Sequence, residues 1–103
     1  MVTRGEVWWV EHPGTGRRPA LVLTRQDALP LLRKVIVVPA TRTRRGIPTE
    51  VALDEDDGMP EYCVLSLDNI RTVPQALLTE RITRLGFERM FDVCRALSHA
   101  TGC

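Results

Sequence analysis

The sequence is poor in histidine, cysteine and aromatic residues. It contains two histidines, three cysteines and 5% aromatic residues in 103 positions. Cys63, Cys94 and Cys103 are an odd number, and their spacing fits neither a zinc site nor a redox pair. We therefore expect no metal ion or other cofactor. Cys63 and Cys94 are interpreted as small core residues and Cys103 as a free thiol.

Long hydrophobic runs are also missing. No apolar segment approaches the roughly 20 residues that span a bilayer, and the first residues lack the hydrophobic segment of a signal peptide. These absences predict a cytoplasmic protein that makes no membrane contact. The content of hydrophobic residues, 44%, and of charged residues, 26%, is that of an ordinary globular protein. A chain of 103 residues has room for one domain, which we expect to span residues 1–103.

Charges of the two signs are separated along the chain, although the formal net charge is only +1. Residues 17–45 carry eight basic side chains and one acid, whereas residues 50–68 carry seven acids and no lysine or arginine. This separation favours a basic face that attracts a polyanion. The alternative is that the two segments form loops that never meet.

Short apolar runs separated by turn residues predict a sheet of short strands. Two runs joined by a Gly/Pro-rich connection resemble a hairpin, and a third run is β-branched and typical of a buried central strand. Single helical turns are expected within 26–32 and 74–78. The predicted strands are 4–10, 20–24, 34–41, 49–53, 62–67 and a short one at 70–73.

The last predicted element is an amphipathic helix over residues 86–100. Phe87, Met90, Phe91, Cys94 and Leu97 recur at helical spacing and should face the core. Antiparallel strands followed by one helix predict a mainly β fold, either a strongly curved sheet or a small barrel.

Adjacent arginines at the start of the second strand are the first candidate binding site. Arg17 and Arg18 present guanidinium groups that suit phosphate oxygens, although they could equally be solvated charges at a strand edge. Thr41 ends the third strand, and the basic loop that follows it offers further contacts to nucleic acid. The candidates there are Arg42, Thr43, Arg44 and Arg45.

Two neighbouring tryptophans lie in the first predicted strand. Because strand residues alternate between faces, one of Trp8 and Trp9 should face inward and the other outward. The outward ring is either a stacking platform for a base or part of the core or of a dimer interface.

In this order the motifs resemble the MazF/PemK family of toxin endoribonucleases. Arg-Gly-Glu-X-Trp followed by Arg-Pro and an apolar run is specific in combination, and the remaining matches continue in the same register to about residue 100. The matching segments are 4–8, 16–23, 37–41, 47–51, 64–72 and 84–86.

The resemblance implies a homodimer of SH3-like barrels, each extended by a C-terminal helix. It also implies metal-independent cleavage of single-stranded RNA at a short motif, leaving a 2′,3′-cyclic phosphate and a 5′-hydroxyl. A cognate, MazE-like antitoxin would inhibit the enzyme by laying an acidic segment across the RNA groove. The arginine before the proline, Arg18, and the threonine that ends the third strand, Thr41, hold the catalytic positions, and Asp68 lies near the RNA site.

This sequence departs from the family pattern in the shortened connection 11–16, at Ser66 and at Asn69. Arginine is found at the position of Ser66 in some members, and Asn69 replaces a glutamine and is a plausible base reader. The residues also offer no obvious general base, because a guanidinium is a very poor proton acceptor. His12 could transfer protons, or it could be an exposed loop residue.

Two other functions are compatible with such a barrel. One is poisoning of DNA gyrase through the end of the C-terminal helix, as in CcdB-type toxins. That class uses an apolar helix end with an exposed tryptophan, and residues 98–103 contain neither. The other is a non-catalytic barrel that binds nucleic acid.

Overall fold

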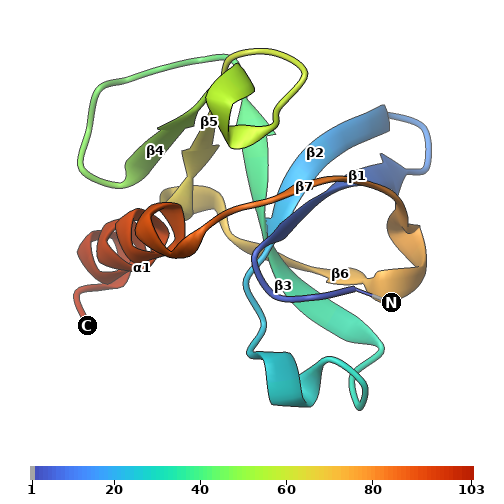
Figure 1. The fold of residues 1–103 in the computed structure, drawn as a ribbon. Coiled ribbons are helices and arrows are strands. Elements are labelled where there is room, and N and C mark those ends of the chain that lie inside the picture. The colour runs from blue at the N-terminus through green and yellow to red at the C-terminus, as the bar shows by residue number, and fades with distance from the viewer. Residues whose placement is uncertain (1) are drawn as a thin grey trace.

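The computed structural model describes residues 2–103, which form a strongly curved antiparallel sheet and a C-terminal helix (Figure 1). None of the helices in this range has the length and hydrophobicity needed to cross a lipid bilayer. The strands are β1 (Glu6–His12), β2 (Gly16–Val22), β3 (Lys34–Thr41), β4 (Glu50–Leu53), β5 (Cys63–Ser66), β6 (Arg71–Pro74) and β7 (Leu78–Arg84). The helix is α1 (Phe87–Thr101), and short 3-10 turns are η1 (Gln26–Ala28), η2 (Glu55–Asp57), η3 (Leu67–Asn69) and η4 (Gln75–Leu77).

The sheet of residues 2–103 is open. Its strands run in the order β4-β5-β3-β2-β1-β7, and β6 pairs with β3 beside β5. Every pairing is antiparallel. The mainly β class with a C-terminal helix is thus confirmed. The sheet curves without closing, so the expected barrel is replaced by a curved sheet whose ends are β4 and β7.

The strand β7 is absent from the sequence prediction. It pairs with β1 along Leu78–Arg84, yet five of its seven side chains are charged or carry a hydroxyl, and only Leu78 is buried. Natural edge strands often carry such polar residues because they discourage pairing with other chains. The same polarity removes the apolar alternation by which a strand is recognised in a sequence.

Two hydrophobic clusters lie on opposite sides of the strands. Leu21 and Val38 belong to the cluster that α1 covers, whereas Ala20, Val22 and Val37 belong to the second cluster. This division follows from the alternation of side chains along β2 and β3. The second cluster opens at one end into the site described below.

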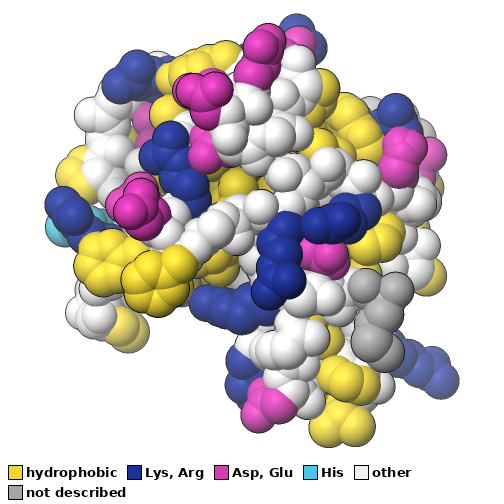
Figure 2. All heavy atoms as spheres, viewed as in Figure 1, with side chains coloured by type: hydrophobic (Ala, Val, Ile, Leu, Met, Phe, Trp, Pro, Cys, Tyr) yellow, Lys and Arg dark blue, Asp and Glu magenta, His cyan; other side chains and the backbone are white. Residues whose placement is uncertain are grey.

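The buried face of α1 differs from the prediction. Val93 and Ala96 are buried, while Met90 and Leu97 pack at the edge of the core as expected. Two predicted core residues, Phe87 and Phe91, are instead 87% and 58% exposed. Hydrophobic side chains are visible on the surface over α1 in Figure 2. Small side chains let the helix lie close to the sheet, which turns the large aromatic rings outward.

The three cysteines are also distributed differently from the prediction. Cys63 is buried and Cys103 exposed, as expected, but Cys94 is exposed because it shares the outward face of α1. Burial, with smaller contributions from Glu61 and Asp57, raises the pKa of the Cys63 thiol to about 11. The neutral thiol is a poor nucleophile.

We expect two thiols of the native protein to react with an alkylating reagent at pH 8. Cys94 and Cys103 are accessible, whereas Cys63 is buried and stays protonated well above this pH. Mass spectrometry of the labelled protein should show two additions, and a third only after denaturation. Rapid native labelling of Cys63 would contradict the packing described here.

The Arg-Gly-Glu-X-Trp motif of residues 4–8 holds the N-terminal segment against the sheet. Glu6 is buried, and its carboxylate accepts hydrogen bonds from the Thr3 backbone N–H at 2.7 Å and the Trp8 indole at 3.1 Å. The guanidinium of Arg81 lies 2.8 Å from the same carboxylate. Gly5 has φ of +90°, a left-handed conformation that glycine adopts without strain. The motif therefore has a structural role.

Candidate RNA-cleavage site

The hairpin of β1 and β2 separates the two adjacent arginines. Val10 pairs with Arg18 and Glu11 pairs with Arg17. Successive residues of a strand point to opposite faces, so the two arginine side chains leave β2 in opposite directions. Arg18 lines a large cavity at the open end of the second hydrophobic cluster, whereas the side chain of Arg17 extends over the ring of Trp9 on the other face.

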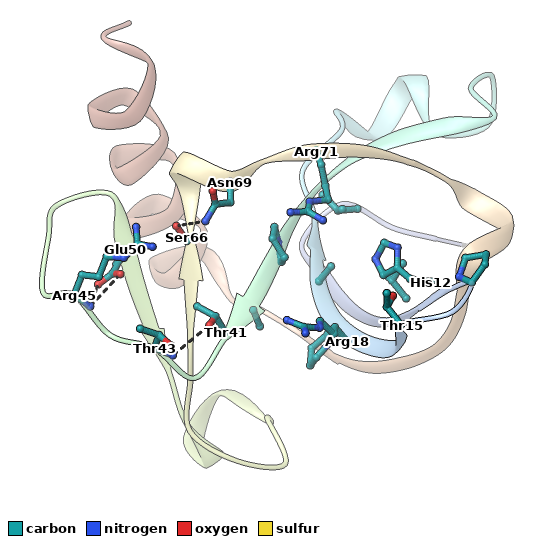
Figure 3. Close-up of a pocket in the computed structure, with 17 residues that line it drawn as sticks. His12, Thr15, Arg18, Thr41, Thr43, Arg45, Glu50, Ser66, Asn69 and Arg71 are labelled. Atoms are coloured by element: carbon teal, nitrogen blue, oxygen red, sulfur yellow. Dashed lines mark hydrogen bonds between the residues drawn. The ribbon is translucent and has the colours of Figure 1, made fainter.

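The cavity has a volume of about 660 Å³ and lies between the β1–β2 hairpin and the β4–β5 side of the sheet (Figure 3). Figure 3 shows His12, Thr15, Arg18 and Arg71 on the hairpin side. Thr41, Thr43, Arg45, Glu50, Ser66 and Asn69 line the opposite side. The floor includes the core residues Val10, Ala20 and Val37.

Thr41 is half-buried at the end of β3, where the chain leaves the sheet. Its hydroxyl oxygen accepts a hydrogen bond from the backbone N–H of Thr43 at 3.2 Å. This bond fixes the hydroxyl and leaves its own proton available to donate. A held donor at the mouth of a cavity is suited to an anionic oxygen.

The charge of the cavity is predominantly positive. Arg18, Arg45 and Arg71 line it together with a single acid, Glu50. The Glu50 carboxylate already accepts hydrogen bonds from the backbone N–H groups of Arg45 and Gly46, at 3.0 and 2.9 Å. Within residues 2–103, Arg18 and Arg71 form no ion pair with an aspartate or glutamate. Their guanidinium groups are therefore available to an anion.

His12 ends β1 inside this cavity. Its side chain is half-buried, and Figure 3 shows it on the same side as Arg18 and Thr15. The alternative that His12 is an exposed loop residue is therefore wrong.

Four predicted RNA-binding residues lie outside the cavity. Arg17 is near Glu80 at 4.0 Å, Arg42 forms an ion pair with Glu61, and Arg44 lines a shallow hollow beside β4. The Asp68 carboxylate accepts a hydrogen bond from the Thr49 hydroxyl at 2.6 Å. Asn69 does line the cavity, and its amide donates to the Ser66 hydroxyl at 3.2 Å.

The separation of charge along the sequence is partly cancelled in space. The basic and acidic segments meet where Arg42 pairs with Glu61, and blue and magenta side chains are interspersed on the face in Figure 2. Asp57 pairs with Arg89 of α1 at 2.9 Å. The cavity itself keeps an excess of positive charge, with three arginines and one acid in its lining.

Arg71 is the main residue of the cavity that sequence reasoning missed. It lies in β6 opposite Val37, two positions before the buried Val73. Residues two positions apart in a strand share a face, so Arg71 lies on the face of the buried Val73, at the edge of the hydrophobic cluster. The spacing of Arg71 and Val73 in the sequence could have indicated this position. Thr15 was missed because it lies in the turn between β1 and β2, where the sequence has no periodicity.

Known proteins share both the sequence and this architecture. Residues 3–101 match the family described as PemK-like, MazF-like toxin of type II toxin–antitoxin system. The chain is 44% identical over 101 residues to the probable endoribonuclease MazF5 of Mycobacterium tuberculosis, covering 97% of this chain and 93% of the relative. The identity to the probable endoribonuclease MazF2 of the same species is also 44%, covering 97% and 98%.

Solved structures agree with the sequence matches. The Mycobacterium tuberculosis toxin MazF-mt6 superposes with a TM-score of 0.86 at 32% identity, covering 94% of this chain and 96% of that one. A mycobacterial endoribonuclease in complex with its cognate antitoxin superposes with a TM-score of 0.87 at 29% identity, covering 99% and 96%. These findings confirm the resemblance drawn from the motifs. By sequence and by fold, the chain belongs to the PemK-like, MazF-like toxin family of type II toxin–antitoxin systems.

Proposed function

We propose that this toxin cleaves single-stranded RNA at a short motif through the 2′-hydroxyl of the substrate, without a metal ion. Membership of the family makes it an endoribonuclease of the MazF type. The observation that carries the proposed chemistry is the cavity in which Arg18 and Arg71 lie with the hydroxyl of Thr41, neither arginine being ion-paired within the described residues 2–103.

The reaction requires charge stabilisation at phosphorus. The 2′-oxygen forms a bond to phosphorus, the bond to the 5′-oxygen breaks, and the products carry a 2′,3′-cyclic phosphate and a 5′-hydroxyl. Arg18 donates charge-assisted hydrogen bonds to the nonbridging oxygens, whose negative charge increases in the transition state. Thr41 donates its hydroxyl proton to the same phosphate or orients the attacking group.

A proton must also leave the 2′-hydroxyl, and another must reach the departing 5′-oxygen. An imidazole can accept and release protons, and His12 lies in the cavity on the side of Arg18. We assign proton transfer to His12. Arg18 keeps its charge throughout, because guanidinium is too weak an acid to exchange protons in this role.

RNA binding rests on the remaining polar side chains of the cavity. Arg45 and Arg71 bind phosphates on either side of the reacting one, and Thr43 and Asn69 offer hydrogen bonds to base edges. Arg17, Arg42 and Arg44 lie outside this cavity, in hollows beside it, and add positive charge near it. Asp68 acts indirectly, by holding Thr49 beside η3.

We further propose that the toxin works as a homodimer and is inhibited in the cytoplasm by a cognate, MazE-like antitoxin. A mycobacterial relative has been solved with its cognate antitoxin, and one MazE–MazF structure of Deinococcus radiodurans shares the fold with a TM-score of 0.82. An acidic antitoxin segment would complement the three arginines of the cavity and exclude RNA.

Incubation of the purified protein with a long single-stranded RNA in EDTA tests the proposal. We expect discrete fragments with 5′-hydroxyl ends and 2′,3′-cyclic phosphates. Fragments should be absent with the Arg18→Ala protein, which controls for contaminating nucleases. Retardation of intact RNA without cutting would indicate a non-catalytic binding barrel instead.

Replacement of Thr41 by valine should lower the cleavage rate at least about tenfold. Valine has the same shape and favours a strand, so the end of β3 is preserved while the donor is removed. RNA affinity, measured with an uncleavable 2′-deoxy analogue, should remain close to the wild-type value. Loss of affinity with an unchanged maximal rate would make Thr41 a binding residue only.

A further inference from the structure

A second hollow, of about 380 Å³, adjoins the cavity and has a different chemistry. The two share five lining residues, so the proposed reacting phosphate lies at their junction: Arg18, Pro19, Ala40, Thr41 and Thr43. We call this hollow the tryptophan pocket, because it also contains Trp9.

The tryptophan pocket has an uncharged floor. Pro19, Ala40, Met59 and Cys63 line it, and the thiol of Cys63 stays protonated up to high pH because burial raises its pKa to about 11. Apolar surface of this kind suits the face of a nucleobase more than it suits a phosphate, which requires hydrogen-bond donors.

One wall carries a stacked pair of side chains. The guanidinium carbon of Arg17 lies 4.3 Å from the centre of the Trp9 ring. Both groups are planar, and indole rings and guanidinium planes are the surfaces on which single-stranded bases stack. Arg17 is about half exposed and its nearest acid, Glu80, lies 4.0 Å away, so the guanidinium can move without breaking a close contact.

The opposite rim carries an exposed acceptor and an exposed donor. Glu61 and Arg42 form an ion pair there, with side chains that are 58% and 82% exposed. A carboxylate accepts from amino or imino groups of a base, and a guanidinium donates to ring nitrogens or carbonyl oxygens. This pair can therefore read the edge of a base whose face lies on the Trp9 wall.

We propose that the tryptophan pocket binds the base of a nucleotide next to the scissile phosphate, stacking it on Trp9 and Arg17 and reading its edge with Glu61 and Arg42. The inference rests on the proposed function, since it places the reacting phosphate at Arg18 and Thr41. It assigns to Arg17 and Arg42 contacts with a base, in place of the phosphate contacts expected from their charge. Glu61 becomes a specificity-determining residue.

Sequencing of cleavage ends tests the edge contact. A long single-stranded RNA of mixed sequence is digested by the wild-type protein, by Glu61→Gln and by the matched control Glu88→Gln, whose carboxylate lies on α1 away from both hollows. We expect Glu61→Gln to reduce the base preference about tenfold at one position beside the cut, and to leave the other positions unchanged. Identical preferences at every position in all three proteins would overturn the proposal.

Tryptophan fluorescence tests the stacking contact independently of cleavage. The variant Trp8→Phe leaves Trp9 as the single tryptophan of the chain, and single-stranded DNA of mixed sequence serves as an uncleavable probe. We expect the DNA to quench Trp9, whereas inorganic tripolyphosphate, which has no base, should not. Equal quenching by both probes, or by neither, would overturn the stacking contact. Quenching by DNA without any RNA cleavage would support base binding in the tryptophan pocket and contradict the proposed nuclease function.

Discussion

Replacement of Arg18 by alanine is expected to lower the rate of RNA cleavage by a factor of about 100 to 1,000. This is the usual cost of losing one preorganised donor to a transition-state oxyanion. The side chain is exposed and makes no ion pair within residues 2–103, so the free energy of unfolding should hardly change. Single-turnover cleavage rates and urea denaturation measure the two quantities.

Arg33 provides the matched control for this experiment. It is also an exposed arginine, and it lies in the connection before β3 and outside the cavity. Arg33→Ala should cleave at close to the wild-type rate. Arg18→Lys should fall between wild type and alanine, because an ammonium keeps the charge but loses the planar fork of donors. A folded Arg18→Ala protein that cuts normally would remove Arg18 from the mechanism.

Replacement of Glu6 by leucine should lower the free energy of unfolding by about 3 kcal/mol. The substitution leaves the indole of Trp8 and the backbone N–H of Thr3 without their acceptor, and Arg81 without its carboxylate. Breaking a buried, fully bonded ion pair typically costs about 3–5 kcal/mol, and the half-exposed side chain of Arg81 places this case at the lower end. Urea denaturation followed by circular dichroism measures the change.

Glu80→Gln is the control for the loss of a carboxylate from an ion pair. Glu80 and Arg17 are both about half exposed and 4.0 Å apart, so their contribution should stay below about 1 kcal/mol. If Glu6→Leu were no more destabilising than Glu80→Gln, the contacts of Glu6 would not stabilise the fold as described above.

Most of the fold could be predicted from the sequence because its strands are apolar where they are buried. The β-branched run of β3 and the Gly/Pro-rich connection between β1 and β2 each determine local structure. Alternation failed for β7, since its edge position leaves few apolar side chains. The helix was found at its correct place, but two overlapping apolar stripes of α1 were available, and tertiary packing chose the one with the smaller Val93 and Ala96.

The site was predictable only in part. Arg18 and Thr41 were identified through the family motifs, and the structure brings both to one cavity. The opposite directions of Arg17 and Arg18 follow from strand alternation once β2 is known to begin at Gly16, before the arginines. Alternation along β6 places Arg71 on the same face as Val73, but the curvature of the sheet, which brings distant strands together, decides that Arg71 and His12 line one cavity with Arg18.

The cavity floor has a consequence for how such a toxin can diversify. Val10, Ala20 and Val37 belong to the second hydrophobic cluster and also line the cavity that we propose binds RNA. A larger side chain at Ala20 would fill space that the RNA needs, and a polar one would weaken folding. We therefore expect changes of target motif to occur most easily at exposed residues such as Asn69 and Glu61, since substitution of an exposed side chain changes the free energy of unfolding little. The floor of the cavity tolerates less change, because the same three side chains serve both the folding of the protein and the shape of the binding site.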